Sequence, residues 1–267
     1  MPTSQETPVR VGVQIAPQHA EYQTLRDTVL RLEDLGVDIA FNWDHFYPLS
    51  GEPDGLHFEG WTMLAAWAEQ TERIEFGPLV SCNSYRNPDL LADMARTVDH
   101  ISAKGGEGRL IFGIGSGWFR RDYDEYGYEF GTAGSRLDEL AEAMPRIERR
   151  WSLLNPAPTR HIPVLIGGGG ERKTLRIVAR HADIWHSFSD ADTLRHKLGV
   201  LDQWCDTIGR DRSEITVSVE PGHADSTSEL DEFHGLGARL FTVGIKAPRF
   251  DWDRVDRLLK WRDAVNG

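Results

Sequence analysis

Residues 163–188 read PVLIGGGGERKTLRIVARHADIWHSF, and this stretch contains a complete strand–helix–strand unit. The apolar run at 163–166 predicts a short buried strand, and the spacing of apolar residues over 171–181 predicts a helix. A second strand is expected at 183–188. Strands that a helical crossover joins pair in parallel, so the stretch predicts a right-handed βαβ unit.

The same alternation of strand and helix extends along the rest of the chain. Strands are expected at residues 9–15, 37–41, 73–80, 109–115, 163–166, 183–188, 215–219 and 238–245. Helices are expected at residues 22–35, 61–72, 88–103, 135–154, 171–181, 192–208, 226–236 and 252–265. Pro145 predicts a kink or a break within the fourth helix, because proline removes a backbone hydrogen bond.

Eight strand–helix pairs indicate the α/β class and predict a single-domain (β/α)8 TIM barrel over residues 1–267. An open doubly wound sheet is the alternative that periodicity leaves open. No linker or low-complexity tract divides the chain. Because the loops that follow the strands build the site of a parallel barrel, the residues after each strand are the candidates for function.

Composition limits the partners of the protein. The 267 residues carry a formal net charge of −12 and include two cysteines, Cys82 and Cys205. The negative charge argues against binding to nucleic acid, and two cysteines do not make a disulfide framework. Residues 1–8 are polar, and no run of about 18 apolar residues occurs. We therefore expect a cytoplasmic protein with neither a nucleic-acid nor a membrane partner.

Two polar loops follow the early strands. The second strand leads into Asp44 and His45, and histidine suits proton transfer near neutral pH. The alternative is a structural histidine that a neighbouring carboxylate satisfies. Pro78 lies inside the third strand, where proline removes a ladder donor, so a bulge is expected near Pro78 and Leu79. Cys82 in the next loop is interpreted as a small polar filler rather than a nucleophile.

Two glycine-rich loops follow the fourth and fifth strands. Gly115, Ser116 and Gly117 precede Trp118, and glycines let a backbone approach a ligand closely. Trp118 is expected either to flank a planar ring or to pack under its loop. The second loop consists of Gly167, Gly168, Gly169 and Gly170. These glycines are expected to begin a helix, and the free N–H groups at a helix N-terminus suit a phosphate group. A flexible turn is the alternative interpretation of the four glycines.

One further histidine follows the sixth strand, and the sequence shows no metal signature. His186 is a second candidate acid or base. Neither an H-E-x-x-H nor a C-x-x-C pattern occurs. No metal ligands are therefore assigned.

Four stretches together resemble the luciferase-like superfamily, and specifically its deazaflavin (coenzyme F420)-dependent oxidoreductases. They are FNWDHF at 41–46, RIEFGPLVSCNSYRNPDLLADMARTVDHIS at 73–102, GRLIFGIGSGWFRRDYDEYG at 108–127 and PVLIGGGGERKTLRIVARHADIWH at 163–186. The resemblance runs from about Val11 to Trp185, and the chain beyond Phe188 matches only as a generic barrel. Several motifs in the same order are more specific than one glycine run.

The resemblance implies a role for each candidate residue. Asp44 would help to hold the coenzyme, and His45 would contact the reacting centre as an acid or a base. Pro78, Leu79 and Val80 correspond to the bulge in which the family has a non-prolyl cis peptide bond, without fixing which bond is cis. The other coenzyme contacts would come from Gly115, Ser116 and Gly117 at the tail and from Gly167, Gly168, Gly169 and Gly170 at the phosphate.

Two departures from the family pattern bear on the substrate. The segment 150–161 is compact where many relatives carry a longer insertion over the site, which would leave the site more open. Trp118 stands where the family's sugar-phosphate dehydrogenases use an acidic residue, which argues against a sugar-phosphate substrate.

The resemblance thus implies an oxidoreductase that transfers a hydride between coenzyme F420 and a small organic substrate. An FMN-dependent luciferase-like monooxygenase is the alternative, because the same glycines suit the FMN phosphate. A second alternative is a non-catalytic barrel that binds phosphate or another ligand, with Asp44, His45 and Trp118 as packing residues. A homodimer is expected by analogy with the superfamily.

Overall fold

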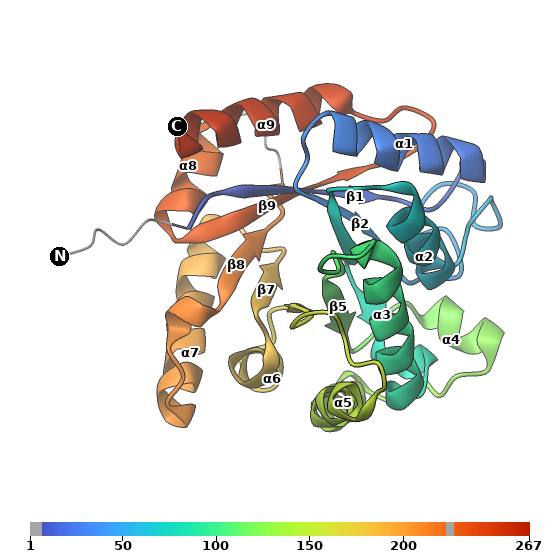
Figure 1. Cartoon of the computed structure of the whole chain (residues 1–267). Coiled ribbons are helices and arrows are strands. Elements are labelled where there is room, and N and C mark those ends of the chain that lie inside the picture. Colours follow the sequence, from blue (N-terminus) through green and yellow to red (C-terminus); the bar gives the residue numbers. More distant parts are fainter. Residues whose placement is uncertain (1–6, 223–226) are drawn as a thin grey trace.

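Parallel strands surrounded by helices make up the part of the chain that the computed structural model describes, residues 7–222 and 227–267 (Figure 1). The strands are β1 Arg10–Ile15, β2 Ile39–Asn42, β3 Glu75–Pro78, β4 Ser81–Cys82, β5 Phe112–Gly115, β6 Val164–Gly167, β7 Ile184–Ser187, β8 Thr216–Val219 and β9 Ala238–Ile245. The helices are α1 Tyr22–Asp34, α2 Gly60–Gln70, α3 Pro88–Ala103, α4 Arg120–Tyr126, α5 Ala133–Leu153, α6 Thr174–His181, α7 Ala191–Ile208, α8 Thr227–Gly235 and α9 Trp252–Asn266. Two short 3-10 helices span Asn83–Tyr85 and Arg212–Glu214.

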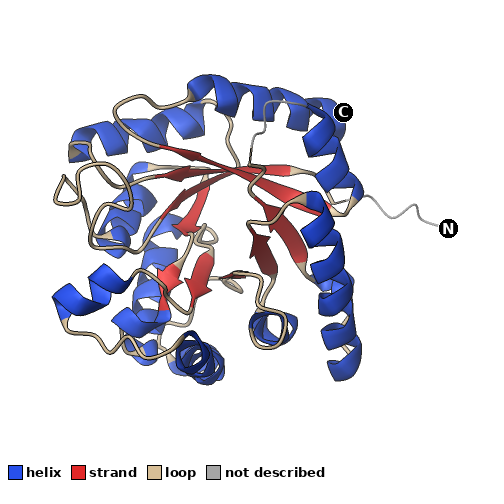
Figure 2. Ribbon diagram, turned by 180° about the vertical axis from the view of Figure 1, so that it is seen from behind, coloured by secondary structure: helices blue, strands red, loops and turns tan. Residues whose placement is uncertain are grey.

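The strands close into a barrel. Their order is β3-β2-β1-β9-β8-β7-β6-β5-β4, and all neighbours pair in parallel. A parallel bridge between Phe76 of β3 and Leu110, which precedes β5, closes the sheet. Figure 2 shows the helices around the outside of the strands. The closure confirms the TIM barrel and rules out the open doubly wound sheet.

Alternating residues of the strands fill two separate cores. On β1, Val11, Val13 and Ile15 face the helices. A smaller apolar layer fills the barrel itself and consists of Ile39, Phe41, Leu79, Ile111, Leu165, Ile184 and Leu240. Gly12 leaves room for this layer, because a Cβ there would come within 2.8 Å of the Phe41 ring. The alternation reflects the period of two along a strand.

Three predicted features differ in the structure. The strand expected at 73–80 ends at Pro78 as β3, which pairs with β2, and a second short strand, β4, follows the expected range and pairs with β5. Of the kink or break expected at Pro145, the break does not occur, because helix α5 continues through this residue. Helix α6 begins at Thr174, three residues later than expected, and the four glycines therefore precede a turn rather than the helix itself.

Two helices, α4 and α8, could not be compared in full with the predicted ones. The sequence does not predict helix α4, because RRDYDEY lacks apolar residues at helical spacing. The expected start of another helix, Ser226, lies outside the described residues, and α8 is described from Thr227. Within the described ranges, no helix is both long and apolar enough to span a bilayer.

Candidate functional site

A pocket of about 390 Å³ opens at the C-terminal ends of the strands. Nine of the candidate residues line it, and they are Asp44, His45, Leu79, Val80, Gly115, Ser116, Gly117, Gly167 and Gly168. The remaining wall is largely aromatic and apolar and includes Trp43, Leu49, Trp118 and Phe188. Pro78, Gly169 and Gly170 are not part of the wall but directly adjoin lining residues. Loops that are far apart in the sequence thus meet at one end of the barrel.

A larger cavity of about 530 Å³ lies near the opposite end, where β6 and β7 begin. Its wall includes Trp151, His161 and Asp183, and none of the candidate residues. Barrel enzymes place their chemistry at the C-terminal ends of the strands. The smaller pocket is therefore the candidate active site.

The floor of the pocket is the bulge between β3 and β4. The peptide bond between Leu79 and Val80 is cis, which identifies the bond that the sequence left open. Gln14 donates its side-chain amide to the Leu79 carbonyl at 2.6 Å. The Val80 side chain projects between two loop glycines, since a Cβ on Gly115 or Gly167 would approach it to 2.8 or 3.3 Å. Larger residues at these glycines would displace the bulge.

Asp44 is a buried carboxylate whose oxygens accept hydrogen bonds from protein groups. Arg86 donates to both oxygens, at 2.6 and 3.0 Å, and the Cys82 N–H donates to Oδ2 at 3.0 Å. Burial raises the pKa of Asp44, and the Arg86 guanidinium opposes this shift. Arg86 also pairs with Glu59 at 2.6 Å. Asp44 therefore ties the loop after β2 to the loop after β4.

His45 is held by a residue that the sequence analysis did not single out. Its Nδ1 lies 2.7 Å from Oδ2 of Asp122, a fully buried residue of α4. The rings of Trp118 and Phe119 flank the imidazole edge-on, with centroids 5.6 and 5.4 Å away. The other ring nitrogen, Nε2, has no hydrogen-bond partner among the described residues. His45 can therefore present Nε2 to a molecule in the pocket.

The four-glycine loop is tethered rather than free. The Trp185 indole donates to the Gly168 carbonyl at 2.8 Å, and the Lys197 ammonium donates to the Gly169 carbonyl. Gly168 has φ +112°, a conformation that favours glycine. The described residues provide no acceptor for the N–H groups of Gly169 and Gly170. Two free donors beside a lysine suit an anion.

His186, the second candidate acid or base, is fully buried and does not line the pocket. Its Nδ1 lies 2.8 Å from Oγ of Ser218. Burial lowers its pKa to about 3, so the ring is neutral at neutral pH. These properties disfavour His186 as the proton donor.

The family model described as luciferase-like monooxygenase matches residues 2–229. The chain belongs to this family. Membership agrees with the resemblance that the four motifs carry, and it places the chain among oxidoreductases.

Two relatives of this luciferase-like protein illustrate its sequence neighbourhood. An uncharacterized protein of Mycobacterium tuberculosis is 29% identical over 160 residues, which are 52% of this chain and 55% of that protein. The F420-dependent glucose-6-phosphate dehydrogenase of Microbacterium testaceum is 26% identical over 253 residues, which are 85% of this chain and 73% of that enzyme. The chain spans only about half the length of the mycobacterial relative.

Solved structures of luciferase-like proteins share the fold. An F420-dependent secondary alcohol dehydrogenase, in complex with an F420-acetone adduct, superposes with a TM-score of 0.83 at 15% identity, covering 98% of this chain and 100% of that chain. The oxygenating constituent of 3,6-diketocamphane monooxygenase from Pseudomonas putida, in complex with FMN, gives 0.63 at 19% identity, covering 79% and 67%. At these identities the likeness establishes the barrel fold.

Proposed function

We propose that this luciferase-like protein is an oxidoreductase that transfers a hydride between coenzyme F420 and a small organic substrate. The observation that carries the proposal is the meeting of the Leu79–Val80 bulge, both glycine loops and His45 around one pocket. A flat ring would fit against the bulge, and an anionic tail would fit beside the free N–H groups of Gly169 and Gly170. The resemblance also leads us to expect a homodimer in the cytoplasm.

Two comparisons favour coenzyme F420 over FMN. The Microbacterium relative, which aligns over most of this chain, is named F420-dependent. The alignment with the F420-dependent alcohol dehydrogenase covers 98% of this chain and 100% of that enzyme. The alignment with the FMN-bound monooxygenase covers 79% of this chain and 67% of that enzyme.

In this proposal the chemistry that a bound deazaflavin would supply is the transfer of the hydride. The chain supplies position and a proton. Val80 would lie against the ring, and Gly115 and Gly167 leave the space that the Val80 side chain occupies. His45 gives a proton to the substrate oxygen, or takes one from it, at Nε2.

An FMN-dependent monooxygenase is the second candidate, because the same barrel carries FMN in the Pseudomonas enzyme. The deciding experiment is a binding titration of the purified protein with coenzyme F420, FMN and nicotinamide coenzymes. We expect F420 to bind much more tightly than the others. Tight binding of FMN alone would replace the proposal by the monooxygenase, and binding of none of them would remove the redox assignment.

Gly170→Asp is expected to weaken F420 binding about 10- to 100-fold, because it places a negative charge beside the phosphate donors, and hydrogen bonds to charged groups contribute about 1.5–3 kcal/mol. Isothermal titration measures the change. Gly199→Asp on α7 is the control, since a side chain there meets nothing within 4 Å. A deazaflavin riboside without the phosphate should bind both variants equally. Equal F420 affinity in both variants would contradict the phosphate assignment.

The substrate is expected to be uncharged. The residues that line the pocket include no lysine or arginine, and Trp118 and Phe188 are 61% and 65% exposed at its edge. A phosphorylated substrate would find no cation there, whereas a neutral alcohol or ketone can pack against the two rings. Assays with bound F420 should show turnover of neutral alcohols or ketones and none of glucose 6-phosphate. The reverse preference would refute this expectation.

A further inference from the structure

We propose that Asp122 is the positioning residue of this site: it holds a hydrogen on Nδ1 of His45 and so directs Nε2 at the substrate oxygen. The inference rests on the proposed function, because His45 is its proton-transferring group. Its geometric part can nevertheless be tested without coenzyme or substrate.

The Asp122 carboxylate lies at the meeting point of three segments. Its Oδ2 accepts from Nδ1 of His45 at 2.7 Å and from the Tyr85 hydroxyl at 2.9 Å, and its Oδ1 accepts from the Phe46 N–H at 3.1 Å. The side chain is 0% exposed. A buried carboxylate with three donors is fixed in orientation, so it also fixes the imidazole plane.

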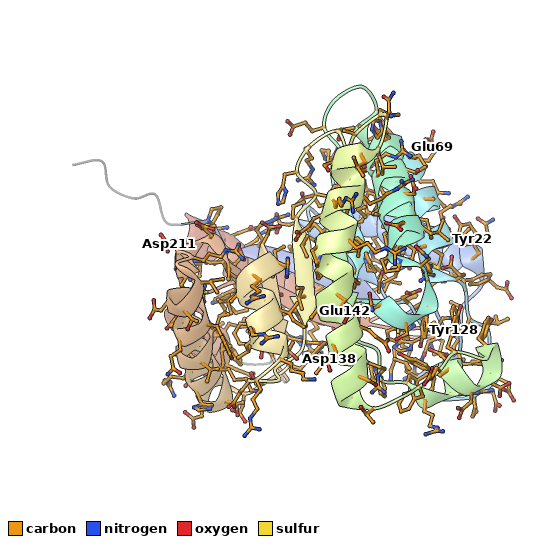
Figure 3. All side chains as sticks on the ribbon, turned by 90° about the horizontal axis from the view of Figure 1, so that it is seen from below. Tyr22, Glu69, Tyr128, Asp138, Glu142 and Asp211 are labelled. Carbon is orange, nitrogen blue, oxygen red and sulfur yellow. The ribbon has the colours of Figure 1, made fainter. Side chains whose placement is uncertain are left out.

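Aromatic packing holds this arrangement rigid. The Phe46 ring lies 4.7 Å from the ring of Tyr85 and 6.3 Å from that of Tyr128. Tyr128, labelled beside α4 in Figure 3, also stacks on Tyr85 at 5.2 Å. Two of the three donors to Asp122 therefore belong to residues that these ring contacts immobilise.

His45 is the cationic partner available to Asp122 among the described residues. Arg86, in the loop after β4, is engaged by Asp44 and Glu59. His57 also faces His45, but burial lowers its pKa to about 4 and Trp43 donates to its Nε2 at 3.0 Å, so it is neutral at neutral pH. The remaining neighbours, Trp118 and Phe119, carry no charge. Asp122 is thus the carboxylate that contacts the His45 ring among the described residues.

This geometry suits reversible proton transfer. When an alcohol is oxidised, its hydroxyl proton would pass to Nε2 of His45, while the coenzyme, when bound, would take up the hydride from the same carbon, and a carbonyl would be left. The resulting imidazolium is paired with the Asp122 carboxylate. A carboxylate in this position both selects the ring tautomer and stabilises the charged ring.

The test combines NMR and kinetics on the full chain. Labelling the ten histidines with 15N, and assigning His45 through His45→Gln, shows which ring nitrogen carries the hydrogen. We expect Nδ1–H in the wild-type protein, with or without F420, and Nε2–H in Asp122→Asn. Nε2–H in the wild-type protein would overturn the proposal even if the variant fails to fold.

The kinetic arm separates positioning from folding. Asp122→Asn should lower the rate of hydride transfer about 10²- to 10⁴-fold with little change in KM or in F420 affinity. Asp124→Asn, an exposed carboxylate of the same helix that pairs with Arg120, should behave as wild type. Equal rates in the two variants would refute the role of Asp122. Failure of the wild-type protein to bind F420 would instead refute the proposed function.

Discussion

His45→Ala is expected to lower the rate of hydride transfer by about 10²- to 10⁴-fold, which is the usual contribution of a positioned acid or base. The Kd for coenzyme F420 should change by no more than about threefold, because the proposed phosphate donors, the N–H groups of Gly169 and Gly170, lie in a different loop. Stopped-flow measurement of deazaflavin absorbance gives the rate, and fluorescence titration gives the Kd. The prediction is therefore a loss of turnover without a loss of binding.

A matched control distinguishes this effect from a general loss of histidine. His161→Ala removes a 72% exposed histidine near the opposite end of the barrel and should leave both quantities unchanged. If His45→Ala lost affinity as strongly as turnover, His45 would be part of the binding surface and not the proton donor. If it lost neither, the non-catalytic barrel would become the better interpretation.

Most of the fold can be predicted because its signals are local. The strand predicted at 238–245 matches β9 in full, and the other predicted strands agree with the structure within a few residues. The missed helix α4 is different, because a short polar helix gains its stability from tertiary contacts such as those of Asp122 and Tyr123. No periodicity marks such a segment.

The continuity of α5 through Pro145 shows how tertiary packing bears on a local sequence signal. Proline removes one hydrogen bond, but the long helix buries Leu140, Met144 and Ile147 on both sides of it. Packing of that face outweighs the local cost of the proline. The sequence rule is correct about the lost bond, but it does not decide between a kink and a break, and the packing keeps the helix continuous.

One part of the candidate site can be predicted from the sequence, and another part cannot. The glycine loops and His45 follow strands, so barrel topology alone predicts that they lie at one rim. Sequence reasoning misses Asp122 and Arg86 because their roles depend on partners 77 and 42 positions away in the sequence. Neither stands directly after a strand. Their importance follows from burial and charge pairing, which one sequence does not display.

Arg86→Leu is expected to destabilise the protein by about 3–5 kcal/mol at neutral pH, because it leaves Asp44 buried without its counterion. The Arg86 side chain is 11% exposed and that of Asp44 1%. Urea unfolding monitored by tryptophan fluorescence measures the change. Arg120→Leu is the matched control: Arg120 is 68% exposed in its pair with Asp124, and exposed pairs contribute about 0–1 kcal/mol.

The pH dependence identifies the cause of this loss. Burial raises the pKa of Asp44, and removal of Arg86 removes the opposing interaction, so the folded variant takes up a proton more readily than an unfolded aspartate, whose pKa is about 3.9. The variant should therefore be closest to wild type near pH 4 and lose stability as the pH rises. Asp44→Asn in the Arg86→Leu background should recover part of the loss at neutral pH, because no charge is then buried. If Arg86→Leu lowered the free energy of unfolding equally at pH 4 and at neutral pH, the cause would be the lost packing of the Arg86 side chain and not the unpaired Asp44 carboxylate.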